Sequence, residues 1–359
     1  MQPPVLFIPG CSGFIGSHLL ERILTTTDYR VVGMDRSCEK IRHLLANDRL
    51  EFVRSDVYSC QTIGTFVKSC DIVISLAALC NPSLYNTIPI TVIDNNFTQP
   101  RDLVRSCAEQ GKRLIHFSTC EVYGRTLSGY LGGKGEEPFR EDESPYLLGP
   151  IGAQRWTYAC AKQLLERLIY AYGREQGLHY TIVRPFNFIG PRMDYIPGID
   201  GDGVPRVVAC FMEALLFNRP LRLVDGGRSR RVFTYIDDAV DAVMAMIERP
   251  DRADRQVFNI GNPANELTIA ELARRMAALY AELAPAGAAR TAGIVSISAE
   301  EFYGPGYEDS DRRIPDVSKA RERLGWIPKT AIDDALRATI LAFIHDYASA
   351  PCPARVANG

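Results

Sequence analysis

The 359-residue sequence lacks three features, each of which would have assigned it to a large class of proteins. It has no stretch of about 18 uncharged apolar residues, which excludes a protein that crosses a membrane by helices. It has no excess of basic charge, because its 41 Lys and Arg residues are balanced in number by 43 Asp and Glu residues. It therefore does not look like a general nucleic-acid binder. It has no CxxC pair and no other spacing typical of metal ligands. We therefore expect function without a metal, a membrane or a nucleic acid.

The N-terminus also lacks the pattern of a secretory signal peptide. Met1–Pro4 leads directly into the strand-like run Val5–Ile8, without a basic segment, a long apolar segment or a cleavage site. The ten cysteines are scattered along the chain. We therefore expect reduced thiols, most of them buried as small apolar side chains, and a cytoplasmic location.

Short apolar runs typical of strands alternate with segments whose apolar residues recur at helical spacing. Two clear helical segments are Gln99–Glu109 and Ala159–Tyr172. This alternation predicts an α/β fold built on a doubly wound parallel sheet. The predicted strands are Val5–Ile8, Arg30–Asp35, Leu50–Arg54, Ile72–Leu76, Leu114–Ser118 and Tyr180–Arg184.

The composition changes near Arg184, after which Gly and Pro interrupt the chain often. We expect a first lobe at 1–184 and a smaller, loop-rich second lobe at 185–350, with segments near 232–262 returning to the first lobe. The last residues, 351–359, are expected to form a flexible tail.

Three glycines follow the first strand and precede the first helical segment. Gly10, Gly13 and Gly16 permit a tight turn and a close approach of backbone N–H groups to a pyrophosphate at a helix N-terminus. Asp35 ends the next strand about 20 residues on, where a carboxylate accepts hydrogen bonds from an adenosine ribose. A carboxylate there repels a 2′-phosphate, so the pattern favours NAD over NADP, a preference that the adjacent Arg36 weakens.

The GxxGxxG spacing resembles that of the short-chain dehydrogenase/reductases. Two later features support the resemblance: Tyr158-Ala-Cys-Ala-Lys162, and Ser118-Thr119 directly after a strand. Tyr158 and Lys162 share one helix face, and a nearby ammonium lowers the pKa of a phenol. The resemblance implies that Tyr158 exchanges a proton with a sugar hydroxyl while a hydride moves to or from NAD, with Thr119 orienting the same hydroxyl.

The second half narrows the resemblance to the extended branch of that superfamily, which acts on nucleotide sugars. Arg184-Pro185-Phe186-Asn187 and Gly190-Pro191-Arg192 carry it, and the implied fold is a Rossmann-type first lobe with a substrate-binding second lobe. The implied cofactor residues are Gly10, Gly13, Phe14, Ile15, Gly16, Asp35, Asp56, Val57, Leu76, Ala77, Ala78, Tyr158 and Lys162. The implied substrate residues are Tyr85, Arg155, Asn187, Arg192, Val204, Arg206, Arg231, Tyr307, Asp309 and Arg313.

Within this branch, two motifs resemble those of the enzymes that decarboxylate UDP-glucuronate. They are Ser118–Gly124 and Gly306–Arg313. The resemblance assigns Glu121 and Arg313 to decarboxylation, and a guanidinium offers a two-pronged match to a substrate carboxylate.

Cys80-Asn81-Pro82, Tyr85-Asn86-Thr87, Arg155–Gln163 and Asp194–Gly201 resemble stretches of the plant-type UDP-apiose/UDP-xylose synthase family, and the resemblance extends from about Val5 to about Tyr347. Cys80 and Cys120 distinguish that family from simple decarboxylases, and a thiol has a pKa closer to neutrality than a Ser hydroxyl. We expect both thiols to take part in proton exchange, with packing as the alternative role. The implied reaction oxidises C4 of UDP-glucuronate, releases CO2, contracts the ring and returns the hydride, giving UDP-apiose with UDP-xylose as co-product.

Two other functions stay open on the sequence. One is a plain decarboxylase that gives UDP-xylose or the UDP-4-keto-pentose. The presence of Cys80 and Cys120 is evidence against it. The other is a non-catalytic NAD-binding regulator, against which the presence of Tyr158 and Lys162 speaks. The resemblance also implies a homodimer that forms through Gln99–Glu109 and Ala159–Tyr172.

Overall fold

The computed structural model describes residues 3–57, 63–133, 137–201, 203–285, 293–303, 308–347 and 350. Tyr307 and the predicted tail at 351–359 lie outside the described residues.

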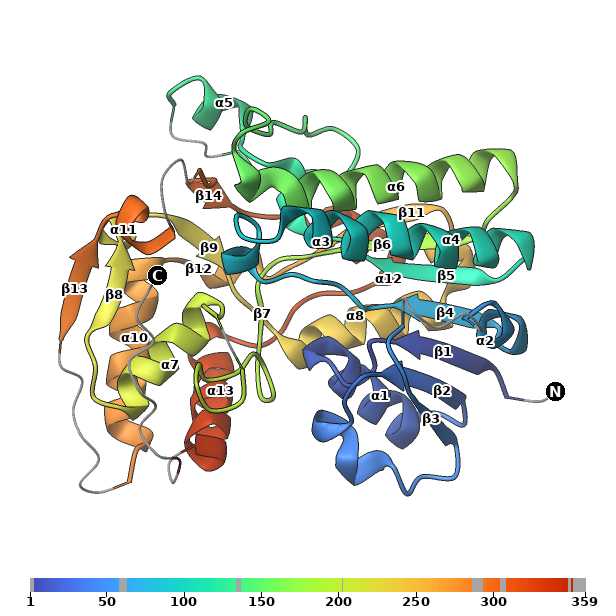
Figure 1. The fold of residues 1–359 in the computed structure, drawn as a ribbon, viewed down its shortest axis with the longest axis horizontal. Coiled ribbons are helices and arrows are strands. Elements are labelled where there is room, and N and C mark those ends of the chain that lie inside the picture. Colours follow the sequence, from blue (N-terminus) through green and yellow to red (C-terminus); the bar gives the residue numbers. More distant parts are fainter. Residues whose placement is uncertain are drawn as a thin grey trace.

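A seven-stranded sheet in the order β11-β6-β5-β4-β1-β2-β3 forms the centre of the first lobe (Figure 1). Every neighbouring pair in it is parallel. The strand order reverses beside β1, so the predicted doubly wound parallel fold is confirmed. The strands are β1 (Val5–Pro9), β2 (Arg30–Asp35), β3 (Leu50–Arg54), β4 (Ile72–Ser75), β5 (Arg113–Phe117), β6 (Tyr180–Pro185) and β11 (Gln256–Ile260).

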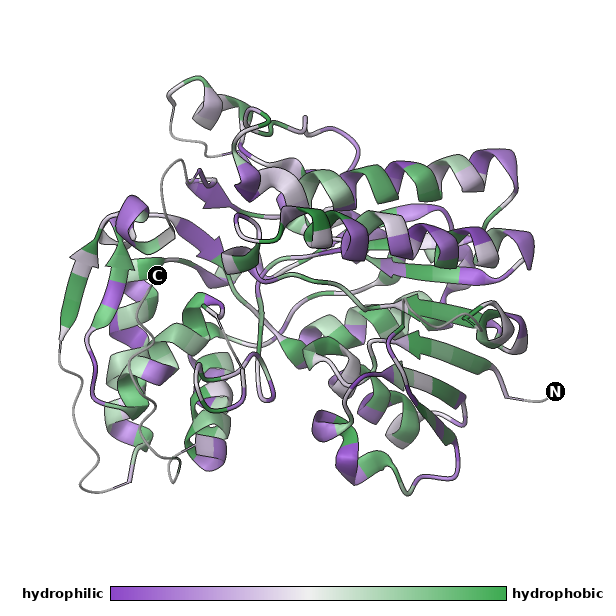
Figure 2. Cartoon of the chain, in the orientation of Figure 1, coloured by the Kyte–Doolittle hydropathy of each residue, from purple (hydrophilic) through white to green (hydrophobic). Residues whose placement is uncertain are grey.

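Alternate side chains of each strand enter two separate apolar cores. Leu6 and Ile8 of β1 face the core that contains α1 (Phe14–Thr26), α8 (Ile236–Glu248) and α12 (Ser318–Leu324). Phe7 faces the opposite core. That second core contains α2 (Ile63–Ser69), α4 (Gln99–Glu109) and α6 (Thr157–Glu175). The strands are apolar because both faces of the sheet are covered by helices. In Figure 2 the central strands are mostly green, whereas the surrounding helices carry both green and purple residues.

The second lobe packs three helices around its own apolar core, at the left of Figure 1. They are α7 (Val207–Leu216), α10 (Ile269–Leu283) and α13 (Ile332–Tyr347). A capping box at Thr268 and Glu271 fixes the start of α10. Small sheets flank these helices: β7 (Phe188–Ile189) with β10 (Thr234–Tyr235), β8 (Leu221–Val224) with β13 (Ile294–Ile297), and β9 (Arg230–Val232) between β12 (Glu266–Thr268) and β14 (Arg312–Arg313).

The chain passes between the two lobes more than once. It leaves the large sheet after β6, forms α7 and β8, and returns through α8 to β11, which pairs with β6. None of the helices described is long and apolar enough to cross a membrane. The remaining elements are short: η1 (Glu39–Leu44), η2 (Pro82–Leu84), α3 (Pro89–Ile93), η3 (Asp94–Thr98), η4 (Cys120–Tyr123), α5 (Leu127–Tyr130), η5 (Gln154–Trp156), η6 (Asp225–Gly227), α9 (Pro250–Ala253), η7 (Pro263–Asn265) and α11 (Ala299–Tyr303).

Candidate active site

A cavity of about 1140 Å³ lies between the two lobes. It is bounded by loops that follow the carboxyl ends of the central strands and by α7, β8 and β9 of the second lobe. This is the place where open α/β sheets bind their ligands. Of the residues predicted from the sequence, it is lined by Cys80, Glu121, Arg155, Asn187, Val204, Arg206, Arg231, Asp309 and Arg313.

The glycine loop forms a tight turn between β1 and α1. Gly10 has a φ of +89°, and a Cβ atom on it would lie 2.7 Å from the backbone N of Ala77. A Cβ on Gly16 would lie 2.3 Å from the carbonyl oxygen of Gly10. Neither position has room for a side chain, so only glycine lets the loop close against the start of the helix.

The N-terminus of α1 is shaped for an anion. Gly13 is its N-cap and offers no side-chain cap, and the first turn contains no acidic residue. Its first N–H groups therefore point outward without a side-chain partner, as a pyrophosphate requires. Leu76 and Ala77 follow β4 and donate their backbone N–H groups to the carbonyl oxygen of Pro9, which holds that loop beside the glycine turn.

Asp35 lies at the end of β2, next to the same loop. Its carboxylate accepts hydrogen bonds from the backbone N of Ser12 at 3.0 Å and of Ser37 at 3.4 Å. Asp56 ends the loop after β3, within 4.0 Å of the Arg36 guanidinium, and Val57 beside it is buried. The loop, the free helix end and the fixed carboxylate together fit a dinucleotide whose adenosine ribose binds Asp35.

Tyr158 of the predicted catalytic pair lies beside Cys80 and Glu121, two residues that line the cavity. Tyr158 is buried and stacks on Tyr85, with ring centroids 5.3 Å apart. Its hydroxyl shares a hydrogen bond with Thr119, whose own Oγ accepts the backbone N–H of Glu121 at 3.1 Å. The Lys162 ammonium, one helical turn further along α6, donates to the carbonyl oxygen of Phe117 at 3.0 Å. These contacts hold Tyr158 and Thr119 side by side, as the sequence predicts.

The electrostatics of this corner differ from the sequence expectation. Burial raises the pKa of Tyr158 well above its ordinary value, and the neighbouring Cys80 and Glu121 raise it further. Burial also lowers the pKa of Lys162 to about 8. In the chain alone the pKa of Tyr158 is therefore raised, not lowered as expected, because loss of solvent disfavours the charged phenolate.

The two cysteines singled out in the sequence both lie near Tyr158, close enough to raise its pKa. Cys80 is exposed to the cavity, whereas Cys120 is buried and shares a hydrogen bond with Arg313. Burial raises the pKa of Cys80, and it raises that of Cys120 to about 11. Both thiols are therefore protonated at neutral pH, and their part in proton exchange stays a prediction.

A buried cluster of charges forms one wall of the cavity. The Arg155 guanidinium donates to both oxygens of the Glu121 carboxylate, at 2.6 and 2.9 Å, and Arg313 donates to one of them at 3.3 Å. Burial alone would raise the pKa of Glu121, but Arg155 and Arg313 hold it below its usual range. Glu121 is therefore an ionised carboxylate in contact with two arginines.

Asp309 extends this cluster into the second lobe. It accepts a hydrogen bond from Arg231 at 2.7 Å, another from Arg313, and lies 3.6 Å from Arg155. Although burial acts to raise it, Arg313, Arg231 and Arg155 hold the pKa of Asp309 well below its usual range. Three arginines and two carboxylates leave one net positive charge beside the cavity, which suits an acidic substrate.

Three further predicted residues also line the cavity. Arg206 caps α7 and is held by the carboxylate of Asp194, with Nε 2.9 Å from Oδ1. Asn187 adopts a φ of +39° and donates its side-chain amide to the carbonyl oxygen of Val232. Val204 donates its backbone N–H to the hydroxyl of Ser83 at 3.4 Å.

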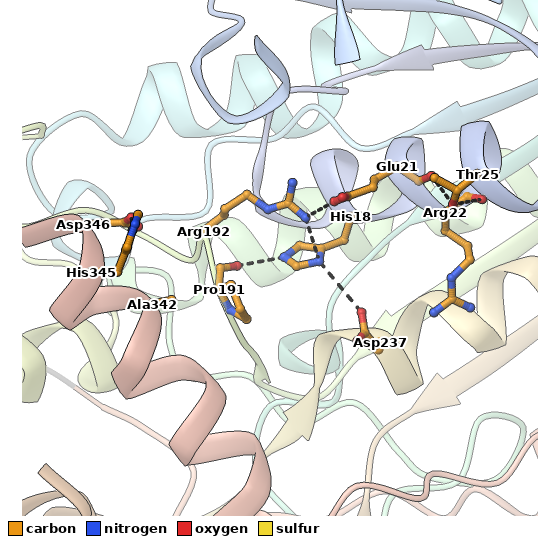
Figure 3. A pocket seen from close by; sticks show the side chains of 10 residues that line it. All are labelled: His18, Glu21, Arg22, Thr25, Pro191, Arg192, Asp237, Ala342, His345 and Asp346. Atoms are coloured by element: carbon orange, nitrogen blue, oxygen red, sulfur yellow. Dashed lines mark hydrogen bonds and ion pairs between the residues drawn. The ribbon is translucent and has the colours of Figure 1, made fainter. Parts of the chain in front are cut away.

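The structure separates Arg192 from the other predicted substrate residues. Its guanidinium donates to Glu21 at 2.6 Å and to Nδ1 of His18 at 3.1 Å (Figure 3). It lines a second, more open pocket of about 520 Å³ on the outside of α1 instead of the large cavity. Arg192 therefore does not line the large cavity in this structure, and its contact with the substrate stays a prediction.

Sequence reasoning missed several residues that shape the cavity. Asn81 donates to the hydroxyl of Tyr195 at 2.9 Å and accepts from Ser83, which ties the loop after β4 to the second lobe. The outer part of the cavity is lined by Phe211, Arg219, Arg222 and Phe302. No motif marks them, because they come from separate elements and meet only after folding.

The chain matches the model of the NAD dependent epimerase/dehydratase family over residues 6–261. It is 49% identical to UDP-D-apiose/UDP-D-xylose synthase 1 of Arabidopsis thaliana, covering 98% of this chain and 94% of that protein. It is 48% identical to UDP-D-apiose/UDP-D-xylose synthase of Oryza sativa subsp. japonica, covering 95% of this chain and 89% of that protein.

Solved structures resemble the chain along nearly its whole length. The PbgP3 protein of Burkholderia pseudomallei is 36% identical with a TM-score of 0.84, covering 97% of this chain and 98% of that one. The UDP-glucuronic acid 4-epimerase of Bacillus cereus, solved with UDP-glucuronic acid and NAD, has a TM-score of 0.79 at 24% identity, covering 96% and 100%. The second likeness is evidence of the shared fold.

Proposed function

The chain belongs to the NAD dependent epimerase/dehydratase family and, within it, to the UDP-apiose/UDP-xylose synthases, and we propose that it converts UDP-glucuronate to UDP-apiose, with UDP-xylose as co-product. NAD is its cofactor. One structural observation carries the proposal: Glu121, Arg155 and Arg313 line one cavity together with Cys80, and the Tyr158 phenol, which is hydrogen-bonded to Thr119, lies next to Cys80 and Glu121.

The first step is oxidation of the sugar at C4, for which bound NAD supplies a reversible hydride acceptor. Tyr158 takes the proton of the C4 hydroxyl as the C4–H bond breaks, and Thr119 orients that hydroxyl. A neutral phenol with a raised pKa is a poor base, so this role needs Tyr158 to ionise more easily in the loaded enzyme than in the chain alone. The positive charge of the oxidised cofactor and the Lys162 ammonium both act in that direction.

The second step is loss of CO2 from the β-keto acid that results. The C5–carboxylate bond breaks, the electron pair moves into the C4 ketone as an enolate, and a proton is then added at C5. Arg313 orients the departing carboxylate, and Arg155 and Glu121 hold that guanidinium in place. Since Glu121 is ionised, it serves as a proton acceptor in this proposal and delivers a proton only after receiving one from water or substrate.

The third step contracts the ring. The C2 hydroxyl loses its proton, the C2–C3 bond breaks, and C3 and C4 share an enediolate. C4 then attacks the C2 aldehyde, which leaves C3 outside the ring as an aldehyde. Return of the hydride to C3 gives UDP-apiose, whereas return to C4 before contraction gives UDP-xylose.

We propose that Cys80 and Cys120 act in this third step as proton donors. Both thiols are neutral and lie near Tyr158, so they can protonate an alkoxide that forms during cleavage or closure. In Cys120→Ser we expect the ratio of UDP-apiose to UDP-xylose to fall about tenfold, since a Ser hydroxyl is a weaker acid than a thiol. Proton NMR of the products measures the ratio, and an unchanged ratio would mean that Cys120 only fills space.

Incubation of the purified protein with UDP-glucuronate and NAD tests the proposed function as a whole. We expect CO2 release and NMR signals of both UDP-apiose and UDP-xylose. UDP-xylose or the 4-keto sugar without any branched product would identify a plain decarboxylase, the second candidate. A complete lack of turnover, with NAD still bound, would favour a regulator.

We also propose that the protein is a homodimer in the cytoplasm. The outer surface of α6 exposes Leu164 and Tyr170, with Ile90 and Ile93 of α3 exposed nearby, which supports an interface on this helical layer. The eight described cysteines are free thiols, which supports a reducing compartment. Light scattering of the purified protein tests the dimer, and Leu164→Glu would convert it to a monomer.

A further inference from the structure

The pocket on the outside of α1 contains an unusual number of charged groups for a region outside the active site. Its arginines are paired with carboxylates: Arg192 with Glu21, and Arg22 with Asp241 just beyond the lining. Neither arginine is therefore without a carboxylate partner, so the pairs leave no arginine of the pocket free for an anionic ligand. Figure 3 shows instead that side chains of α1 converge on Pro191 and Arg192, the loop that follows β7. The pocket marks a junction between the two lobes.

The loop from Pro191 to Asp194 has a strained backbone. Arg192 has a φ of +63° and Asp194 a φ of +49°, in the left-handed region that residues other than glycine rarely adopt. Such a conformation persists only where surrounding contacts impose it. The first lobe supplies those contacts.

Lys40 of η1 makes the most central of these contacts. Its ammonium donates to the backbone carbonyl oxygens of Arg192, at 2.5 Å, and Asp194, at 3.3 Å. It therefore binds the carbonyl groups of both left-handed residues with one charged group. A hydrogen bond to a charged donor is about twice as strong as one between neutral groups.

His18 and Glu21 of α1 hold the beginning of the same loop. Burial lowers the pKa of His18 to about 4, so the ring is neutral at physiological pH. Nδ1 faces the Arg192 guanidinium at 3.1 Å and must accept, which places the ring proton on Nε2, where it is donated to the carbonyl oxygen of Pro191 at 2.8 Å. Glu21 accepts a hydrogen bond from the same guanidinium nitrogen of Arg192 that donates to His18, at 2.6 Å.

The end of the loop reaches the large cavity. The Asp194 carboxylate accepts hydrogen bonds from Nε of Arg206 at 2.9 and 3.0 Å and from its backbone N at 3.2 Å. Arg206 lines the cavity, and its guanidinium lies over the ring of Phe14, at 5.5 Å from the centroid. The direction of this guanidinium is therefore set by where Asp194 is held.

We propose that Lys40 is a positioning residue for substrate binding: by holding the left-handed Arg192–Asp194 backbone, together with His18 and Glu21, it aims Arg206 into the cavity. The inference rests on the proposed function, because it takes the anionic part of a UDP-sugar as the group that Arg206 meets. Lys40 itself does not line the cavity and touches neither the reacting atoms nor the substrate.

The same contact links the cofactor site to the substrate site. Asp35 accepts the N–H of Ser37, Ser37 accepts the N–H of Glu39, and Lys40 follows directly in η1. A cofactor ribose bound to Asp35 orders this segment and, through Lys40, the loop that carries Asp194. NAD and UDP-sugar should therefore bind with positive coupling.

Calorimetric titration of the NAD-loaded protein with UDP tests the proposal. We expect Lys40→Met to weaken UDP binding about five- to tenfold, the effect of losing one charge-assisted hydrogen-bonding group. We expect kcat at saturating UDP-glucuronate and the affinity for NAD to change less than twofold. Lys40→Arg, which keeps the charge, should recover part of the UDP affinity.

Arg22→Gln is the matched control. Arg22 lines the same pocket but pairs with Asp241 and does not touch the loop, so its removal should leave UDP affinity unchanged. The thermal midpoint of each variant shows whether it folds, and Lys40→Arg replaces Lys40→Met in the comparison if the latter does not.

A double-mutant cycle distinguishes positioning from a general loss of structure. Because Lys40 acts through Arg206, Lys40→Met should have little further effect on UDP binding in an Arg206→Gln background. Additive effects, or an unchanged UDP affinity in Lys40→Met, would overturn the inference. Failure of the unmodified protein to bind UDP would instead overturn the proposed function.

Discussion

The two ends of the active site are built in different ways. At the cofactor end, Gly10 and Gly16 act through their lack of side chains, and the binding groups are backbone N–H groups at the start of α1. At the sugar end, Arg155, Arg313 and Asp309 act through charged side chains brought together from distant parts of the chain. The first end depends on shape within one short segment, and the second depends on charge balance across the whole fold.

Tyr158 lies between the cofactor end and the sugar end. Loss of its hydroxyl should therefore slow the reaction without weakening the binding of either ligand. In Tyr158→Phe we expect kcat to fall about 1000-fold, the usual contribution of a general acid–base group. The phenyl ring keeps the stacking on Tyr85, so the affinities for UDP and NAD should stay within about twofold of the unmodified protein. Product formation followed by NMR measures kcat, and a loss of less than tenfold would remove Tyr158 from the proposed catalytic role.

Gly16→Ala should damage the cofactor end alone. The new Cβ would lie 2.3 Å from the Gly10 carbonyl oxygen, so the loop must move, and we expect NAD affinity to fall about 100-fold, which corresponds to the upper range for overpacking. Gly64→Ala in α2 is the control, since its nearest neighbour would be the Ser106 hydroxyl at 3.6 Å. Fluorescence titration with NADH measures the affinity, while UDP binding reports on the sugar end. A loss of UDP binding equal to that of NAD would contradict the separation of the two ends.

The cofactor end is easier to predict from the sequence than the sugar end, because its residues lie within one short segment of the chain. Gly10, Gly13, Gly16 and Asp35 lie within one strand–turn–helix–strand unit, so their spacing predicts both structure and ligand. The large sheet is also predictable from local sequence. Its strands are covered on both faces and therefore appear in the sequence as short apolar runs.

The sugar end could be predicted only through family resemblance. Arg313 lies 192 residues beyond its partner Glu121, and nothing local in the sequence indicates that they meet. Arg192, which the resemblance also assigns to the substrate, lines the pocket outside α1, where its guanidinium binds Glu21 and His18. The thiol pKa values could not be predicted either, because they depend on burial.

Lowering the pH should reduce the stability of the folded protein, because the charge balance at the sugar end depends on ionised carboxylates. The pKa of Asp309 is lower in the folded protein than in the unfolded chain, so its ionised form stabilises the fold above about pH 4, the ordinary Asp value, and this contribution is lost as the pH falls further. Asp309→Asn removes one partner of buried arginines, and we expect it to cost about 3 kcal/mol of unfolding free energy at pH 7.

Urea unfolding at a series of pH values measures this contribution. The difference between the unmodified protein and Asp309→Asn should be constant from pH 7 to about pH 5 and should shrink below about pH 4, where the unfolded Asp309 becomes protonated. Glu282→Gln is the control, because Glu282 pairs with Arg337 at the surface, where solvent screens the pair, and its loss should leave stability nearly unchanged. A difference that does not vary with pH would show that Asp309 contributes packing alone.

The proposed reaction contracts a sugar ring after decarboxylation. UDP-glucuronate labelled with ¹³C at C3 tests it most directly, because the proposed retro-aldol and aldol steps expel that carbon from the ring. With NAD and the purified protein, the label should appear in the hydroxymethyl branch of UDP-apiose and also at ring C3 of UDP-xylose. A label found only at ring carbons would contradict the account and leave a decarboxylase.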